Sequence, residues 1–137
     1  MKFWENLINE LYGTCPTSYL GKVLLRKIAF YDNSQEVNSF FYNGNRYWFD
    51  KVVRNSLFNL ASNTKEPITL LLGDDLITIP RKDAVKFLAD LESYASKCYI
   101  TTHNHLTSVK RLHSITDMID YDYTSGYPEK LNLNDYL

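Results

Sequence analysis

The residues best able to do chemistry in this sequence are its histidines, because a neutral imidazole binds metal ions and carries protons near neutral pH. His103 and His105 flank Asn104 in the string YITTHNHLTS, which spells the letters of a metal-dependent class of nucleases. In that class, however, the letters denote residues from separate parts of a ββα fold. Two residues two positions apart on a helix point about 160° apart, whereas two ligands of one ion need a spacing of three or four. The pattern therefore predicts no metal site at these histidines.

The acidic residues also lack the pattern of a catalytic or metal site. Asp74 and Asp75 fall in a predicted hairpin turn, where aspartate is favoured by hydrogen bonds to the local backbone. Asp117, Asp120 and Asp122 lie close together, but the alternate oxygen ligands and closing glutamate of a calcium loop are missing. The sequence has no GxSxG motif, no glycine-rich phosphate loop and no Cys/His dyad. We therefore expect no catalytic residue, no metal, no cofactor and no enzymatic activity.

Length and charge narrow the class of protein. A chain of 137 residues is long enough for one hydrophobic core. Its 15 basic and 16 acidic residues give a formal net charge of -1, which predicts no direct contact with nucleic acid and no membrane binding. Polar residues interrupt the apolar N-terminal stretch, so no signal peptide is expected, and Cys15 and Cys98 have neither disulfide nor zinc spacing. Eleven tyrosines exceed the need of a small core and are typical of protein interfaces.

Local signals predict an early helix and then hairpins. Helical spacing favours a first helix over residues 3–12. The pair Asn43-Gly44 between two aromatic runs is a strong hairpin signal, and the expected strands cover 23–31, 37–42 and 46–49. Asp50 then caps a helix that runs to about residue 62. Its predicted inward stripe consists of Val53, Ser56, Leu57, Leu60 and Ala61.

A second hairpin precedes the longest helix. The segment ITLLLGDDLITIP contains a strand, a turn at Gly73-Asp74-Asp75, a second strand and Pro80, which opens a helix. From Ala84 onward, apolar or near-apolar residues recur every three or four positions, which predicts one helix of about thirty residues. The stripe contains Phe87, Leu91, Ala95, Cys98, Thr102, His105, Val109 and Leu112.

Side chains near the end of this helix have distinct expected roles. His105 lies on the apolar stripe and is expected to be a packed, hydrogen-bonded interior residue, whereas His103 and His113 are expected to be solvated or capping residues. Ser114, three residues before Asp117, predicts the cap of a short helix over 115–119.

These elements predict an α+β fold, with a small antiparallel sheet built from β-hairpins and packed helices that include one long helix in the C-terminal half. We expect a single domain over residues 1–137. Its parts are an N-terminal helix and linker (1–22), a hairpin-rich sheet with one helix (23–80), a long helix and a short helix (81–120), and a C-terminal strap (121–137).

The C-terminal segment YDYTSGYPEKLNLNDYL has neither helical nor strand periodicity. Gly126 and Pro128 enforce a turn, and the apolar surface of Tyr121, Tyr123 and Tyr127 must be buried somewhere. Two interpretations are open: a strap laid back over the helices, which we favour, and a projecting arm that anchors a neighbouring subunit.

The string LADLESYASKCYITTHNHLTSVKRLHSITDMIDYDYTSGYPEKL, residues 88–131, resembles a domain of unknown function found in bacteriophage tail-fibre and other virion-associated proteins. That family has a long helix with a YA, C, T, H progression, a short helix, and a closing YD-T-GYP or YD-T-GWP turn. The matching positions are Tyr94-Ala95, Cys98, Thr102, His105, Tyr121-Asp122, Thr124 and Gly126-Tyr127-Pro128. The resemblance extends upstream to cover 40–133, while 1–35 lie outside it. The family has no agreed biochemical activity, so the resemblance implies a phage origin and packing of the helix seam against the turn.

The expected function is that of a bacteriophage structural protein in the tail, baseplate or connector region, acting through protein–protein contacts. Its expected partners are other phage structural proteins and further copies of itself in a ring or other oligomer. Its expected location is the virion, after synthesis in the host bacterial cytoplasm. The alternative is a non-virion assembly factor such as a tail-fibre chaperone. The residues expected to bind partners or to support the structure are Tyr121, Tyr123, Tyr127, Pro128, Trp48 and His105.

Overall fold

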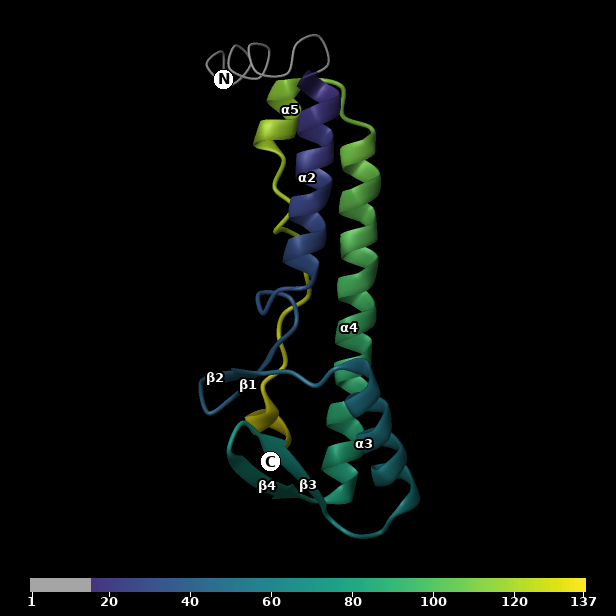
Figure 1. Cartoon of the computed structure of the whole chain (residues 1–137). Coiled ribbons are helices and arrows are strands. Elements are labelled where there is room, and N and C mark those ends of the chain that lie inside the picture. Colours follow the sequence, from purple (N-terminus) through teal and green to yellow (C-terminus); the bar gives the residue numbers. More distant parts are fainter. Residues whose placement is uncertain (1–15) are drawn as a thin grey trace. The chain divides into compact units, whose positions relative to one another are not determined.

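The computed structural model describes residues 16–137, which form two compact units (Figure 1). Unit 1 contains described residues 16–37 together with 98–127, and unit 2 contains 38–97 together with 128–137. Helices and two antiparallel hairpins are present, so the predicted α+β class is confirmed. The expected helix over 3–12 lies outside the described residues. Each unit takes two separate stretches of chain, and the expectation of one domain over residues 1–137 stays a prediction.

The first described element of unit 1 is a helix where a strand was expected. α2 runs over Pro16–Asp32 and includes all of the predicted strand 23–31, so that prediction was wrong and the boundary at residue 22 falls inside the helix. The reason is periodicity: Leu20, Leu24 and Ile28 recur every four residues, a helical stripe that β-prone composition does not override. Leu24 and Ile28 are 6% and 0% exposed.

Among the described residues, three helices contribute to the core of unit 1. Leu24 and Ile28 of α2 pack with Val109 near the end of α4 (Arg81–Lys110) and with Met118 of α5 (Ile115–Asp120). Gly21 also faces Met118, and a Cβ there would lie 3.6 Å from the Met118 methyl carbon, an ordinary van der Waals distance. The short helix begins as predicted, with the Ser114 side chain accepting a hydrogen bond from the Asp117 amide at 3.0 Å.

Unit 2 contains both hairpins. β1 (Phe40–Tyr42) pairs with β2 (Asn45–Tyr47), and β3 (Ile68–Leu72) pairs with β4 (Asp75–Ile79). The first turn has φ of 50° at Asn43 and 80° at Gly44, the left-handed pair that a two-residue hairpin loop requires. The hairpins form where they were predicted, but β1 and β2 are shorter than expected, and the two hairpins form two separate two-stranded sheets.

α3 (Lys51–Asn63) begins at the predicted cap, where the Asp50 carboxylate accepts a hydrogen bond from the Val53 amide at 3.0 Å. Its predicted inward stripe is confirmed at Ala61, which is 0% exposed, and at Leu57, which packs against the core, but it was wrong at Ser56, Val53 and Leu60, the last two being 40% and 55% exposed. The residues that point inward are Arg54 and Ala61. Arg54 takes the inward position because its guanidinium contacts the Trp48 ring, the Phe49 carbonyl oxygen and the Glu92 carboxylate. Val53 and Leu60 then face solvent.

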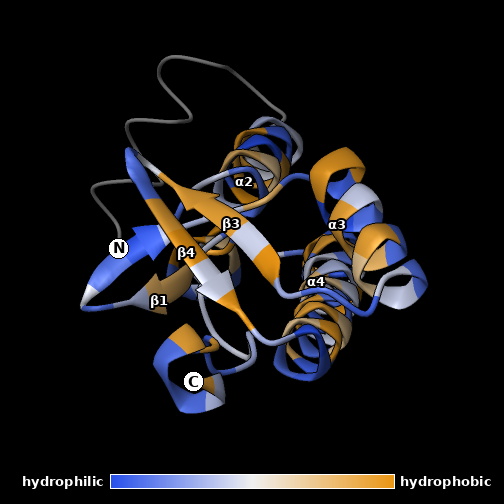
Figure 2. Cartoon of the chain, turned by 90° about the horizontal axis from the view of Figure 1, so that it is seen from below, coloured by the Kyte–Doolittle hydropathy of each residue, from blue (hydrophilic) through white to orange (hydrophobic). Residues whose placement is uncertain are grey.

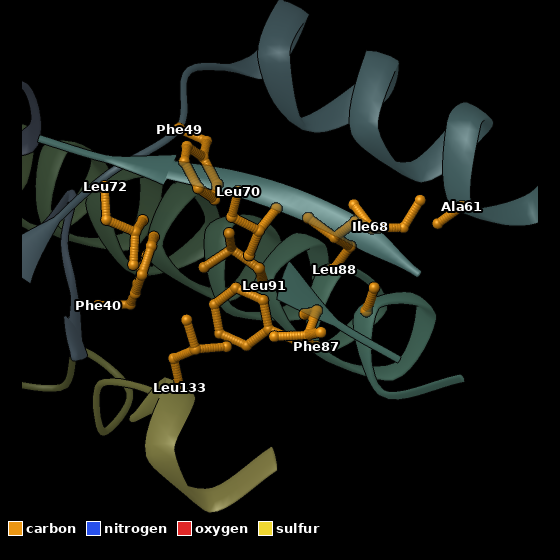
Figure 3. Packing of buried hydrophobic residues seen from close by; sticks show 12 residues of the cluster. Phe40, Phe49, Ala61, Ile68, Leu70, Leu72, Phe87, Leu88, Leu91 and Leu133 are labelled. Carbon is orange, nitrogen blue, oxygen red and sulfur yellow. The ribbon is translucent and has the colours of Figure 1, made fainter. Parts of the chain in front are cut away.

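The core of unit 2 joins α4 to both hairpins, to α3 and to the C-terminal segment (Figure 3). α4 spans thirty residues, as predicted, and its first part supplies Phe87, Leu88 and Leu91, each no more than 1% exposed. The Phe87 ring contacts Phe40 edge-on, with 5.1 Å between ring centroids. Leu133, in the short 3-10 helix Leu133–Tyr136, is 0% exposed and completes this core.

Candidate functional site

A group of hydrogen-bonded polar side chains lies in unit 1 where α4 meets the segment after α5. Thr102 and His105 are three residues apart on α4 and share its buried stripe. Asp32 ends α2, and Tyr121 and Tyr127 come from the segment that follows α5. We call these five residues the polar seam.

His105 is held through both ring nitrogens. Its Nε2 lies 2.7 Å from the Ser125 carbonyl oxygen, and its Nδ1 lies 2.6 Å from the Tyr121 hydroxyl. A carbonyl oxygen only accepts, so Nε2 carries the proton, and in the neutral ring Nδ1 accepts from Tyr121. The His105 and Tyr121 rings also meet edge-on at 5.5 Å. This geometry leaves neither nitrogen open to a metal ion or a substrate.

Thr102 connects the other two members of the polar seam. Its hydroxyl donates to the Asp32 carboxylate at 2.7 Å, so the Tyr127 hydroxyl, also at 2.7 Å, is the donor in the second hydrogen bond. Burial raises the pKa of Tyr127, and the negative charge of Asp32 adds to that shift. Among residues 16–137, every buried side-chain nitrogen and oxygen has a hydrogen-bond partner. The predicted packing of this helix seam against the turn is therefore confirmed.

Residues 121–127 fold into a tight turn that supports these contacts. The Asp122 carboxylate accepts from both the amide and the hydroxyl of Thr124, and these hydrogen bonds hold the pKa of Asp122 below its usual value. Gly126 adopts φ of 83°, which glycine tolerates best, and its carbonyl accepts from the Thr101 hydroxyl at 3.3 Å. The segment packs on α4, as the strap interpretation predicts, and does not project as an arm.

The remaining predicted residues lie in unit 2. The Trp48 ring lies 5.0 Å from the Arg54 guanidinium, and its centroid is 6.1 Å from that of Tyr94. Arg54 also donates to the Phe49 carbonyl oxygen at 2.9 Å and pairs with the Glu92 carboxylate.

Pro128 lines a 170 Å³ cavity beside Tyr94, and the neighbouring Lys130 ammonium donates to the Tyr94 hydroxyl at 3.0 Å. The predicted site residues thus fall into two groups, one in each unit. Their role in binding a partner stays a prediction.

An open groove on unit 1 was not predicted from the sequence. We call it the α2 groove; its volume is 560 Å³, and it is lined by Val23, Arg26, Lys27, Phe30, Tyr31, Ser34, Glu36 and Tyr123. The available signal was the spacing of Val23, Lys27 and Phe30, which places them on one face of a helix, but the segment was interpreted as a strand.

Aromatic packing forms the floor of the α2 groove. The Tyr31 ring meets Tyr123 edge-on at 5.7 Å and Tyr127 at 5.5 Å, which connects the groove to the polar seam. Burial raises the pKa of Tyr31, and the nearby Glu36 carboxylate adds to the shift. Phe30, in contrast, is 81% exposed at the groove.

Two further findings on residues 16–137 concern metal binding and membranes. Within the described chain, no three His, Cys, Asp or Glu side chains come together in a way that could hold a metal ion. No helix in residues 16–137 has the length and apolar character needed to cross a membrane.

Comparison with known protein families, with curated proteins and with solved structures gave no match. The resemblance to the phage domain therefore stays a prediction.

Proposed function

We propose that this protein is a structural subunit of a bacteriophage particle, in the tail, baseplate or connector region, and that it acts by binding other proteins. The observation that carries the proposal is the exposure of large apolar side chains on both units. Phe30 and Tyr99 of unit 1 are 81% and 73% exposed, and Val52, Leu60 and Leu76 of unit 2 are 75%, 55% and 72% exposed. Burying one exposed Val, Leu or Phe side chain contributes roughly 1.5–3 kcal/mol before the costs of association, so a partner that covers such residues on either unit gains binding energy.

The polar seam supports binding in preference to catalysis. The ring nitrogens of its histidine and the hydroxyls of its threonine and tyrosines form hydrogen bonds that hold residues 121–127 against α4. A general base or nucleophile must reach a substrate proton or a reacting atom. The polar seam is therefore suited to a rigid scaffold, which a subunit in repeated contact with neighbours requires.

The phage setting rests on the resemblance of residues 88–131 to a virion-associated domain, including the Gly126-Tyr127-Pro128 turn. A particle component and a non-virion assembly factor make different predictions, because only the former remains in the finished particle. Mass spectrometry of purified particles, from the phage that encodes the chain, is the test. We expect a fixed number of copies in each particle. Presence in infected cells together with absence from particles would refute the structural role in favour of an assembly factor.

A variant tests whether the exposed apolar surface carries the function. Val52→Ser combined with Leu60→Ser removes two exposed side chains of α3 without touching the core. We expect the variant to fold but to enter particles poorly. The matched control is Asn55→Ser combined with Asn59→Ser on the same helix, which changes exposed polar residues. Equal incorporation of both variants would contradict a role for this face.

A further inference from the structure

We propose that the α2 groove binds the tip of the β3–β4 hairpin of a second copy of this chain, so that copies associate head to tail. This inference rests on the proposed function for its biological setting and names a contact within it. The two surfaces lie on different units of the chain and are described separately. Their chemistry is complementary in both apolar character and charge.

The groove presents two cations and one carboxylate next to apolar surface. Arg26 and Lys27 are exposed on α2, Glu36 lies at the same groove, and no carboxylate of residues 16–137 forms an ion pair with either cation, so the groove carries net positive charge. Phe30 lies one turn further along the same helix face and is 81% exposed. The volume of 560 Å³ falls within the range of about 300–1,000 Å³ that is typical of binding pockets.

The hairpin tip presents the opposite pattern. Leu71 and Leu76 are directly opposite each other in the register and are 60% and 72% exposed. Asp74 and Asp75 lie beside them, both exposed and without an ion-pair partner in the described residues. Figure 2 shows the hydrophilic start of β4 followed directly by hydrophobic ribbon, with hydrophobic ribbon also on β3.

Charge selects this pairing over the two symmetric ones. Groove against groove would bring together two surfaces of net positive charge, each with Arg26 and Lys27 against the single carboxylate of Glu36. Tip against tip would bring together two pairs of carboxylates, Asp74 and Asp75 of each copy, so each symmetric arrangement joins surfaces of like net charge. Groove against tip places two cations near two carboxylates and Phe30 near two leucines. Since the two surfaces differ, the contact is heterologous, and repetition generates a closed ring or an open filament.

The test is sedimentation velocity of the full chain over about 1 µM to 1 mM, a range that covers weak protein contacts. The wild type should associate increasingly with concentration, and less so at high salt. The groove variant Arg26→Glu/Lys27→Glu and the tip variant Asp74→Lys/Asp75→Lys should each weaken association at least about tenfold, because each makes groove and tip alike in charge.

Mixing supplies the decisive measurement. In a mixture of the two variants, an acidic groove meets a basic tip and an acidic tip meets a basic groove, so association should return. The chain with all four substitutions should also associate alone. Phe30→Ala and Leu76→Ala, at exposed positions, should each weaken association while leaving the circular dichroism spectrum unchanged.

The control is Lys51→Glu/Lys65→Glu, which makes the same charge change at exposed positions of unit 2 outside the tip. It should associate like the wild type. A wild type that stays monomeric throughout, or variants that fail to complement each other when mixed, would overturn the contact. A chain found in particles but monomeric would overturn this inference alone, whereas a chain that associates as described but is missing from particles would overturn the proposed function alone.

Discussion

Replacing Thr102 by valine tests whether the polar seam holds residues 121–127 in place. Valine has nearly the shape of threonine, so the packing on α4 is kept while the hydroxyl is lost. That hydroxyl donates to Asp32 and accepts from Tyr127, each at 2.7 Å. Both bonds join segments far apart in sequence, and their loss should loosen unit 1 without changing its core.

The magnitude follows from the two bonds. A hydrogen bond to a charged group contributes about 1.5–3 kcal/mol, and the Asp32 bond belongs at the low end because the site is only partly buried. The neutral Tyr127 bond contributes about 0.5–1.5 kcal/mol. Thr102→Val should therefore lower the free energy of unfolding by roughly 2–3 kcal/mol. Tyr127→Phe should cost about 1 kcal/mol, since Thr102 keeps its bond to Asp32.

A double-mutant cycle in urea, followed by circular dichroism, measures the coupling. The double variant should be little less stable than Thr102→Val alone, because both partners of the Tyr127 bond are then gone, which gives a coupling of about 1 kcal/mol. Thr107→Val is the matched control on the same helix and should stay within about 0.5 kcal/mol of the wild type. If the Thr102 and Tyr127 effects simply added, the hydroxyls would not be coupled and the role assigned to the polar seam would be wrong.

Other parts of the fold give further expectations. Leu91→Ala should cost roughly 2–5 kcal/mol in urea denaturation as a large-to-small change in a fully buried position, and a neutral effect would contradict its place in the unit 2 core. Arg54→Ala should cost roughly 2–5 kcal/mol through its lost hydrogen bond, cation–π contact and ion pair, with exposed Lys51→Ala as the near-neutral control. Burial, together with the hydrogen bond to Asp90, raises the pKa of Tyr136. The free energy of unfolding should therefore fall as the pH rises above about 10, where tyrosine in the unfolded chain ionises. Tyr136→Phe should flatten that fall, and an unchanged pH profile would refute the role of Tyr136. Addition of a chelator should leave the Tm unchanged, and a shift of several degrees in a thermal melt would reveal a metal contribution to the fold.

Local backbone chemistry was readable from the sequence. The turn at Asn43-Gly44 needs two residues with positive φ, and few pairs other than asparagine and glycine supply them. The caps at Asp50 and Ser114 each depend on a side chain and an amide only three residues apart. Such signals are contained within a few residues, so tertiary contacts were not needed to interpret them.

The errors arose where a long-range contact or a competing pattern decided the outcome. In residues 23–31 the β-prone composition hid a spacing of four between Leu24 and Ile28, and the α2 groove was missed for the same reason. On α3, the inward position of Arg54 depends on Glu92, 38 residues away, so the helix spacing alone could not set the rotation. The burial of His105 was predicted correctly because it shares the apolar stripe of α4. The sequence predicted that it contacts the C-terminal turn, but it did not identify Tyr121 and Ser125 as the partners.

The alternation of the two units along the chain has a consequence for biosynthesis. α2 leaves the ribosome early, yet Leu24 and Ile28 must wait for Val109 and Met118 before their core can close. Unit 2 waits longer still, because its core includes Leu133. Contacts between residues so distant in sequence cannot form until both partners have been synthesised, which leaves apolar helix faces exposed on the nascent chain. The growing polypeptide is therefore expected to bind general chaperones that recognise exposed apolar segments. The core of unit 2 can be completed only after residues 128–137 have been made.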